Sequence, residues 1–388
     1  MTVNPKLSNL LLDGNVRRQL SAVKIPVGTA ATLPPQCYTN DDIFKWEQEE
    51  LFGRSWIGIG RVDRWKERGD YSAIDIAGVP IIVLRDREGD LHAFSNSCRH
   101  RGAKLLQGDG NCDTVRCPFH RWTYALDGRL LLGPSMDKTP DFDKLEYGLI
   151  PVRLETKFGF AFVCFDESAP GLDQWLGDFE KLHAPWVLHD LHTTRRLEFE
   201  AACNWKIFIE VFNEYYHLPY VHPKTLDHYY DTPQDTDEVT GQYTTQFGTT
   251  QGSAGVLENA QDQALPIMNR LQGRERNGIR YTWLFPNLTF AASNDCIWAY
   301  DVNPLAPDLT RVGMSVCFPE ENIAREDFEQ RVQSYYTRLD ESLQEDISAL
   351  INQQAGLNSP LAQQGRFCYL EPSVANFACW YAEKLLAQ

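Results

Sequence analysis

No stretch of this 388-residue sequence contains the roughly 20 consecutive apolar residues that a membrane-spanning helix requires. The longest apolar segment, residues 158–165, has the length of a buried strand. Residues 1–31 mix charged with apolar side chains and contain no compact apolar signal segment. These absences predict a protein that has no membrane partner and is cytoplasmic.

Basic residues are too few to balance the acidic ones. The sequence has 37 Lys and Arg against 53 Asp and Glu, which gives a formal net charge of −16. Because such a surface would repel phosphate groups, we expect no nucleic-acid partner. The charge is compatible with a cationic substrate or a basic partner protein, although it also favours solubility by itself.

The ten cysteines are scattered and suggest no disulfide framework. Several lie among apolar residues and are expected to be small buried thiols. A dinucleotide-binding fingerprint is also missing, because Gly58-Ile59-Gly60 is followed by neither a third glycine nor a helix. No Cys-x4-Cys-x2-Cys ferredoxin motif is present. The chain therefore has no evident means of taking electrons directly from a nicotinamide.

The first half of the chain predicts an all-β module. Short alternating strands with regularly spaced turns run from about residue 56 to 165. Residues 81–94 predict one hairpin, and Ala125–Leu130 predicts a second around an Asp-Gly turn.

The second half predicts helices packed against an antiparallel sheet. A strand at 197–203 leads into a helix at 204–217, which Pro219 should end. Residues 225–269 contain no Lys or Arg but many Gly, Thr, Ser and Gln, so we expect a long loop there. Later strands and helices are predicted at 281–285, 288–292, 296–302, 310–318, 325–354 and around 377–385.

The predicted fold class is therefore α+β. We expect an N-terminal arm at 1–40, an all-β domain at 41–175, and a domain of antiparallel sheet and helices at 176–388. A chain of this length is more often two domains than one.

A cysteine–histidine pair occurs twice in the β module, as Cys98-x-His100 and, after sixteen intervening residues, as Cys117-x-x-His120. Two such loops can clasp a [2Fe–2S] cluster, with two thiolates on one iron and two imidazoles on the other. The alternative is a zinc site, which usually takes two cysteines from one loop and two histidines from another. Because each loop here carries one of each, the pattern favours the iron–sulfur cluster.

Glu214, His217 and His222 form a second candidate metal motif. Two imidazoles and one carboxylate on one side of an iron leave open positions for oxygen and substrate. On an unbroken helix, His217 and His222 would differ in direction by roughly 140° and could not face one ion. We expect Pro219 to end the helix and allow His222 to turn toward His217.

The first motif, with Trp122 and Tyr124 after it, resembles the Rieske motif. This motif lies before Asn204-Trp205-Lys206 and before the motif Glu-x-x-His-x4-His. A chain with the motifs in this order resembles the large (alpha) subunit of Rieske non-heme iron oxygenases. The resemblance extends from about residue 40 to the end, and the nearest branch is that of choline, carnitine and betaine monooxygenases. It implies a Rieske [2Fe–2S] domain followed by a catalytic domain with a mononuclear Fe(II).

The resemblance also implies roles for two carboxylates. The family takes its third iron ligand from a late helix, and 344–347 resembles that helix, with Asp346 at the matching position and Glu345 as the alternative. An ordinary solvated acidic pair is the other interpretation. At the position of Glu214, the family has a carboxylate, more often Asp, that links the histidine on the iron to a Rieske histidine of the neighbouring subunit. Such a bridge implies a head-to-tail homotrimer.

The implied activity is that of a terminal oxygenase that uses O2. Electrons would come from NAD(P)H through a separate flavin and iron–sulfur reductase, with or without a ferredoxin. A Rieske electron carrier without oxygenase activity is the alternative of another class, although such a carrier needs only the β module. A zinc-stabilised interaction module is a third interpretation.

Aromatic residues crowd the second motif and the later strands. Because aromatic faces attract quaternary ammonium groups, the pattern favours N-methyl hydroxylation and demethylation of a betaine, carnitine or choline. The alternative is an aromatic ring-hydroxylating oxygenase, in which these residues form the core or surround an arene. The predicted pocket residues are Phe212, Tyr216, Tyr220, Tyr229, Trp283 and Trp298.

Overall fold

The computed structural model describes residues 14–24, 26–226, 231 and 233–387. The chain divides into two compact units, one of Phe52–Ala169 and one that combines Met1–Leu51 with Pro170–Gln388. Among the described residues, no helix has the length and apolar character needed to cross a bilayer.

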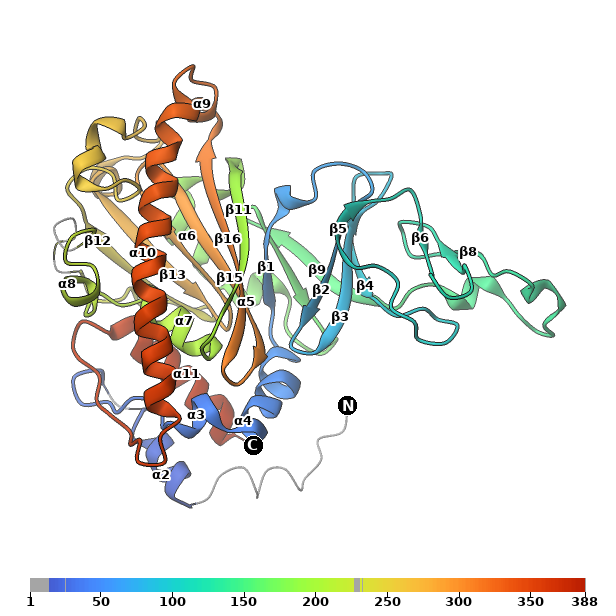
Figure 1. Ribbon diagram of the computed structural model, residues 1–388, viewed down its shortest axis with the longest axis horizontal. Coiled ribbons are helices and arrows are strands. Elements are labelled where there is room, and N and C mark those ends of the chain that lie inside the picture. The colour runs from blue at the N-terminus through green and yellow to red at the C-terminus, as the bar shows by residue number, and fades with distance from the viewer. Residues whose placement is uncertain (1–13, 25, 227–230, 232, 388) are drawn as a thin grey trace. The chain divides into compact units, whose positions relative to one another are not determined.

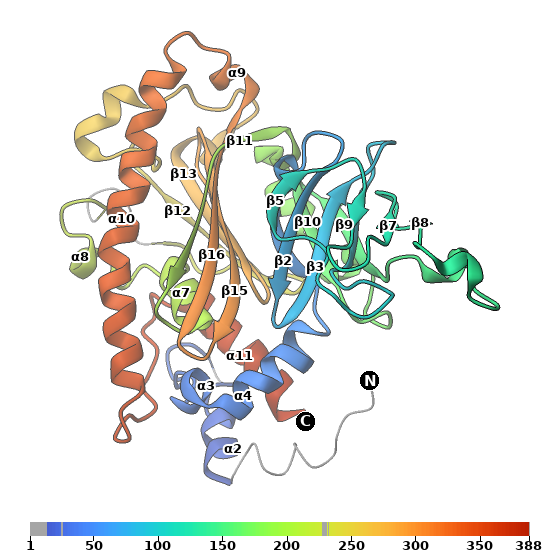
Figure 2. The same ribbon diagram turned by 45° about the vertical axis from the view of Figure 1, so that its right-hand side comes forward.

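The Phe52–Ala169 unit is built around a seven-stranded antiparallel sheet (Figure 2). In spatial order, its strands are β1 (Ile57–Arg61), β10 (Phe160–Cys164), β9 (Pro151–Lys157), β4 (Leu91–Ser95), β3 (Val79–Arg85), β2 (Asp70–Ile76) and β5 (Gly108–Asn111). The predicted hairpin at 81–94 is confirmed, since β3 and β4 pair with Ile82 opposite Phe94.

A smaller three-stranded sheet supports the loops that carry the cysteine–histidine pairs. It consists of β6 (Val115–Arg116), β7 (Thr123–Tyr124) and β8 (Leu130–Leu132). The predicted turn between β7 and β8 requires its glycine, because Gly128 has a φ of 86° and a Cβ there would lie 2.5 Å from the Phe94 ring. Short helical turns complete this unit at η2 (Val62–Arg64), η3 (Met136–Lys138) and η4 (Lys144–Tyr147).

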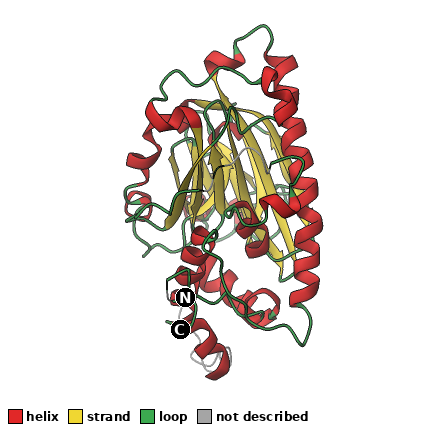
Figure 3. Ribbon diagram, turned by 90° about the vertical axis from the view of Figure 1, so that its left-hand side faces the viewer, coloured by secondary structure: helices red, strands yellow, loops and turns green. Residues whose placement is uncertain are grey.

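The other unit contains a six-stranded antiparallel sheet flanked by helices (Figure 3). In spatial order, its strands are β11 (Leu191–Ala201), β16 (Leu309–Pro319), β15 (Ile297–Ala306), β14 (Leu288–Ala292), β13 (Gly278–Leu284) and β12 (Tyr243–Thr249). The four strands predicted between 281 and 318 are confirmed to within a few residues. With the β-sheet unit before it, this arrangement confirms the α+β fold class.

Helices cover both faces of this sheet. The longest, α10 (Phe328–Leu357), runs along one face and confirms the helix predicted at 325–354 (Figure 1). On the opposite face, His183 of α6 (Phe179–His183) lies with Nε2 2.7 Å from Thr282 Oγ1. The remaining helical segments are α2 (Gly14–Ser21), α3 (Gln36–Thr39), α4 (Asp41–Trp46), η1 (Glu47–Phe52), α5 (Leu172–Leu176), η5 (Ala184–Trp186), η6 (Leu188–Asp190), α7 (Trp205–Phe212), α8 (Leu218–Val221), η7 (Glu258–Gln263), η8 (Gly273–Asn277), α9 (Glu320–Ile323) and α11 (Pro372–Leu386).

The predicted helix at 204–217 is wrong in its extent, since α7 ends at Phe212. Asn213 ends it by taking a non-helical conformation, with φ −112° and ψ 22°. Its side-chain amide donates to Ile209 O at 2.7 Å, and its Oδ1 accepts from Thr289 Oγ1 at 3.1 Å. The helix end is therefore held both by its own last turn and by the sheet.

The long loop predicted at 225–269 is also wrong in part, because it contains β12. Most of this strand is buried although it is rich in Thr and Gln. Its polar side chains find partners within the sheet: Thr245 Oγ1, for example, donates to Tyr281 O at 3.0 Å. Hydrogen-bonded threonines therefore fit a buried strand that composition alone does not indicate.

Candidate metal centres and active site

Two closed loops carry the cysteine–histidine pairs of the Phe52–Ala169 unit. In the first, the Cys98 amide donates to Ala103 O at 2.9 Å, and the Gly102 amide donates to Cys98 O at 2.8 Å. In the second, the Cys117 amide donates to Trp122 O at 2.8 Å. These backbone bonds tighten each loop, so that a cysteine and a histidine project from one turn.

The four predicted cluster residues meet with two donors of each kind. Cys98 and Cys117 are buried, and the rings of His100 and His120 are 4.7 Å apart between centroids. The Nδ1 atoms of both rings are buried without a hydrogen-bond partner in the described part of the chain. Buried imidazole nitrogens of this kind, beside two thiols, fit a [2Fe–2S] cluster that would be bound through Nδ1.

The arrangement of these donors in two mixed loops favours a two-iron cluster over a single zinc ion. Zinc sites usually take two cysteines from one loop and two histidines from another, whereas each loop here carries one cysteine and one histidine. Two such loops suit a cluster with two thiolates on one iron and two imidazoles on the other.

Aromatic side chains surround the cluster donors. Tyr124 Oη lies 3.3 Å from Cys98 Sγ and accepts from the Arg99 amide at 3.1 Å, and the Trp122 ring stacks on His100 at 5.0 Å. Burial, and then the hydrogen bond to Cys98, raise the pKa of Tyr124. The phenol therefore keeps its proton and can donate it to a metal-bound thiolate.

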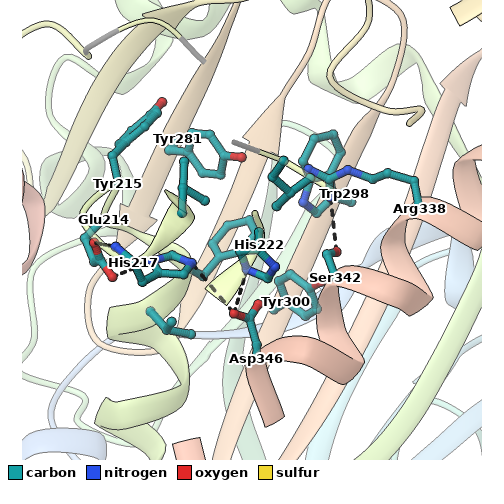
Figure 4. Close-up of a pocket in the computed structure, with 14 residues that line it drawn as sticks. Glu214, Tyr215, His217, His222, Tyr281, Trp298, Tyr300, Arg338, Ser342 and Asp346 are labelled. Carbon is teal, nitrogen blue, oxygen red and sulfur yellow. Dashed lines mark hydrogen bonds and ion pairs between the residues drawn. The ribbon is translucent and has the colours of Figure 1, made fainter. Parts of the chain in front are cut away.

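The short helix α8 organises the second site. His217 precedes α8 and His222 follows it, so a single turn separates the two imidazoles. Pro219 lies in the first turn of α8 and starts this helix instead of ending the previous one, contrary to the prediction. The Nε2 atoms of His217 and His222 lie 3.7 Å and 2.9 Å from Asp346 Oδ1 (Figure 4). Ligand atoms of these three residues lie within 4.8 Å of one another, and two imidazoles with one carboxylate suit Fe(II).

Two glutamates bind the other nitrogen of each imidazole. Glu214 Oε1 lies 2.5 Å from His217 Nδ1, and Glu345 Oε2 lies 2.7 Å from His222 Nδ1. A carboxylate at Nδ1 keeps the proton there and leaves Nε2 for a metal. Burial lowers the pKa of His217, but the hydrogen bond and charge of Glu214 and the charge of Asp346 outweigh burial, so that the pKa is raised.

A cavity opens beside these residues, between α7, α8, α10 and the strands β13 and β15 (Figure 4). Five of the fourteen residues on its wall are Phe, Tyr or Trp. Among them, the Phe212 ring makes edge contacts with Tyr281 at 5.3 Å and with Tyr300 at 4.9 Å between centroids. The other wall residues besides the three candidate ligands are Val211, Glu214, Tyr215, Leu218, Leu226, Trp298, Arg338 and Ser342.

The structure places only part of the predicted pocket on this wall. Phe212 and Trp298 line the cavity. Tyr216 and Tyr220 do not, and they are 47% and 74% exposed. The reason is the early helix end, after which the chain turns and directs these rings outward. Tyr229 lies outside the described residues.

Trp283 is a further correction, because it belongs to the core. Its ring stacks on Phe377 of α11 at 3.9 Å, so α11 covers this end of the sheet. Conversely, the sequence prediction missed Arg338 and Ser342 on the cavity wall. Both precede Asp346 at intervals of four residues, and this helical spacing would have placed all three on one face of α10.

Two family models match the chain. The Rieske [2Fe-2S] domain matches residues 55–143, and the ring hydroxylating alpha subunit (catalytic domain) matches residues 188–387. With a cysteine–histidine cluster site and a separate two-histidine, one-carboxylate site, the fold defines a Rieske-type oxygenase, an oxidoreductase that uses molecular oxygen. More specifically, the chain belongs to the ring-hydroxylating alpha subunit family.

Three proteins are similar to the chain over most of its length. The glycine betaine monooxygenase oxygenase subunit of Pseudomonas aeruginosa is 26% identical over 387 residues, covering 92% of this chain and 89% of that protein. The chloroplastic choline monooxygenase of Spinacia oleracea is 28% identical over 372 residues, covering 93% and 79%. A crystal structure of a quaternary ammonium Rieske monooxygenase with its substrate L-carnitine matches with a TM-score of 0.76 and 25% identity, covering 95% and 98%.

The protein is thus an oxygenase component with a Rieske [2Fe–2S] cluster and a mononuclear iron as cofactors. It uses O2 together with electrons from a reductase and acts on a small molecule. Both donor sets described above fit these cofactors.

Proposed function

We propose that the chain is a terminal oxygenase that hydroxylates an N-methyl group of a quaternary amine of the betaine, carnitine or choline type. The observation that carries this proposal is the aromatic-walled cavity that opens on His217, His222 and Asp346. Quaternary ammonium groups bind against aromatic faces. The similarity to glycine betaine and choline monooxygenases and to a carnitine-binding structure supports the same substrate class.

The proposed ligands follow from the donor geometry. When bound, the cluster supplies stored electrons and the iron supplies oxygen activation. Glu214 and Glu345 hold the two imidazoles with their protons on Nδ1. The cluster ligands are Cys98, His100, Cys117 and His120, and the iron ligands are His217, His222 and Asp346.

Besides its substrate, the proposed reaction needs only O2, electrons from the reductase and protons. One O2, two electrons and two protons convert one methyl C–H bond into a C–O–H group and release one water. The resulting N-hydroxymethyl group is unstable: its hydroxyl proton leaves as the C=O bond forms, and the N–C bond breaks with its electron pair kept by nitrogen. The products are formaldehyde and the demethylated amine. The cavity residues contribute by holding the ammonium group against the rings of Phe212, Tyr281 and Tyr300 and by excluding water.

We further propose a homotrimer in which Glu214 connects neighbouring subunits. Glu214 lies against His217 and two residues from the exposed Tyr216. In the Phe52–Ala169 unit, the Nδ1 atoms of His100 and His120 are buried without a partner, whereas both residues as a whole are partly exposed. One carboxylate can accept a hydrogen bond from an imidazole of each subunit and so couple the two sites. A head-to-tail arrangement that closes gives a ring.

Oxygen consumption coupled to a surrogate reductase tests the proposed reaction. The panel contains glycine betaine, L-carnitine and choline on one side, and benzoate and naphthalene on the other. We expect formaldehyde in proportion to the oxygen consumed with a quaternary amine. A cis-diol or phenol from an arene would instead establish a ring-hydroxylating oxygenase. A protein that binds the cluster but no third iron would be an electron carrier.

Glu214→Gln tests the bridge. We expect turnover to fall at least tenfold while the cluster, the iron and the trimer seen by light scattering are kept. The control is Glu258→Gln, which changes an exposed glutamate of η7. A wild-type monomer that turns over, or a Glu214 variant with full activity, would contradict the inter-subunit arrangement.

A further inference from the structure

The hydroxyl of Thr225 meets the carboxylate that holds His222. Thr225 Oγ1 donates to Glu345 Oε2 at 2.6 Å, and the same carboxylate oxygen lies 2.7 Å from His222 Nδ1. Because an ionised carboxylate only accepts hydrogen bonds, this oxygen accepts one from the hydroxyl and one from the imidazole. Hydroxyl, carboxylate and imidazole thus form a continuous chain whose last atom is His222 Nε2, the atom that faces Asp346.

Thr225 belongs to a turn that closes on His222 itself. The amides of Thr225 and Leu226 both donate to His222 O, at 3.2 Å and 3.1 Å. Glu345, in contrast, belongs to α10 and is 120 residues away from Thr225 in the sequence. The Thr225 hydroxyl therefore joins the turn after α8 to the helix that also carries Asp346. Since Leu226 lines the cavity, the same turn contributes to the cavity wall.

The two glutamates at the imidazole Nδ1 atoms are held in different ways. Glu214 is held by its own segment, because its Oε2 accepts from the backbone amides two and three residues further on. Glu345 reaches His222 from a separate helix, and its side chain is 32% exposed. A long, partly exposed side chain has several accessible rotamers. The hydrogen bond from Thr225 favours the rotamer in which Glu345 accepts from His222.

We propose that Thr225 is a positioning residue for the mononuclear iron, acting on His222 through Glu345. This inference deepens the proposed function and rests on the proposed iron ligands. Groups that hold a metal-bound imidazole in place raise the affinity of the site for its metal. Thr225 acts one bond further from the metal than Glu345 does, so its effect on iron affinity is smaller than that of Glu345.

Anaerobic competition with an iron chelator tests this role without relying on turnover, in protein whose cluster is intact. Thr225→Val and Thr225→Ala lack the hydroxyl, and each should raise the dissociation constant of the mononuclear Fe(II) by about 3- to 10-fold. Thr225→Ser keeps the hydroxyl and should stay within about twofold of the wild type. Co(II) bound in place of this iron should show altered visible absorption bands in the Val and Ala variants but not in the Ser variant, because these bands depend on ligand geometry.

A double-mutant cycle shows whether Thr225 acts through Glu345. Glu345→Ala removes the acceptor of the Thr225 hydroxyl, so the Thr225→Val, Glu345→Ala double variant should bind iron as the Glu345→Ala variant does. A threonine that merely supports the fold would add its own loss to that of Glu345→Ala. Additive losses, or failure of Thr225→Ser to restore iron affinity, would overturn the proposal.

Thr194→Val is the matched control. Thr194 of β11 is also partly buried, and its hydroxyl also contacts α10, because it accepts from Tyr336 Oη at 2.9 Å. Its other hydrogen bond goes to Val316 O in the sheet. This variant loses a hydroxyl next to the same helix but far along it from Glu345, and it should leave the iron dissociation constant unchanged.

Asp346→Ala distinguishes this inference from the proposed ligands. If that variant keeps the mononuclear iron, the proposed ligand set is wrong, and the role of Thr225 falls with it. If Asp346→Ala loses the iron while Thr225→Val binds it as tightly as the wild type, the ligand set stands and the role of Thr225 is wrong.

Discussion

Glu345 and Asp346 are adjacent in α10, yet they bind opposite nitrogens of the same imidazole. Glu345 Oε2 lies 2.7 Å from His222 Nδ1, and Asp346 Oδ1 lies 2.9 Å from His222 Nε2. Successive residues of a helix point about 100° apart, so the His222 ring lies across the helix surface between the two carboxylates. One helix thus both orients this ring and provides the carboxylate on its metal-facing side.

Asp346→Ala should remove the mononuclear iron and abolish turnover, while the cluster spectrum stays unchanged. Glu345→Gln should retain iron with about 10- to 100-fold lower affinity, because it only weakens the hold on His222. Iron and acid-labile sulfide analysis measures both outcomes. Loss of iron in the Glu345 variant but not in the Asp346 variant would reverse the roles assigned to the two residues.

Tyr124→Phe should lower the reduction potential of the cluster. The hydroxyl lies 3.3 Å from Cys98 Sγ, and a donated hydrogen bond stabilises the more negative, reduced cluster. A hydrogen bond to a charged group corresponds to a shift on the order of 50–100 mV for one electron. Redox titration followed by visible spectroscopy measures it. Tyr147→Phe, which changes a ring 5.9 Å from Trp122, is the control and should leave the potential unchanged.

Glu210 should make the protein less stable as the pH rises. Burial raises the pKa of this carboxyl to about 8, against the lowering effects of the Tyr38 hydrogen bond and of Lys206. Between the unfolded value of about 4.3 and about 8, the folded state holds a proton that the unfolded state has lost, so stability falls over this interval. Glu210→Gln should remove this dependence and gain melting temperature at pH 8 relative to the wild type.

Thermal unfolding at several pH values measures the effect. Glu329→Gln, at an exposed position of α10, is the control and should follow the wild type. Parallel curves for the wild type and the Glu210 variant from pH 5 to 8 would show that the carboxyl is ionised throughout.

Lys206→Met should destabilise the sheet-and-helix unit severely. Lys206 Nζ lies 2.5 Å from Glu47 Oε1 and both side chains are almost fully buried. Without the ammonium group, the Glu47 carboxylate keeps Trp205 Nε1 and the Tyr381 hydroxyl as donors but has no counter-charge. We expect a loss of about 3–5 kcal/mol in the free energy of unfolding. Chemical denaturation should show recovery in the Glu47→Gln, Lys206→Met double variant, and a double variant no better than the single one would contradict the pairing.

Local chemistry explains the elements that sequence could predict. The turn at Asp127-Gly128 depends on one residue that tolerates a positive φ, and the long helix α10 depends on its own periodicity. The cysteine–histidine spacing is likewise local. None of these requires knowledge of what packs against the element.

Tertiary packing determines the features of the structure that could not be predicted from the sequence. Asn213 ends a helix because Thr289, 76 residues away, bonds to its amide. The strand at Tyr243–Thr249 is polar in composition but buried by pairing with β13. Trp283 became a core residue because α11 covers it. In each case, a partner distant in the sequence overrode the local preference.

His217 and His222 sit at the two ends of α8, which is a single turn of four residues. Inserting or deleting one residue in this interval would rotate one imidazole by about 100° relative to the other. The length of the interval is therefore more tightly constrained than its composition. Libraries that randomise Leu218, Tyr220 and Val221 at fixed length should yield many iron-binding variants, whereas libraries one residue longer or shorter should yield almost none.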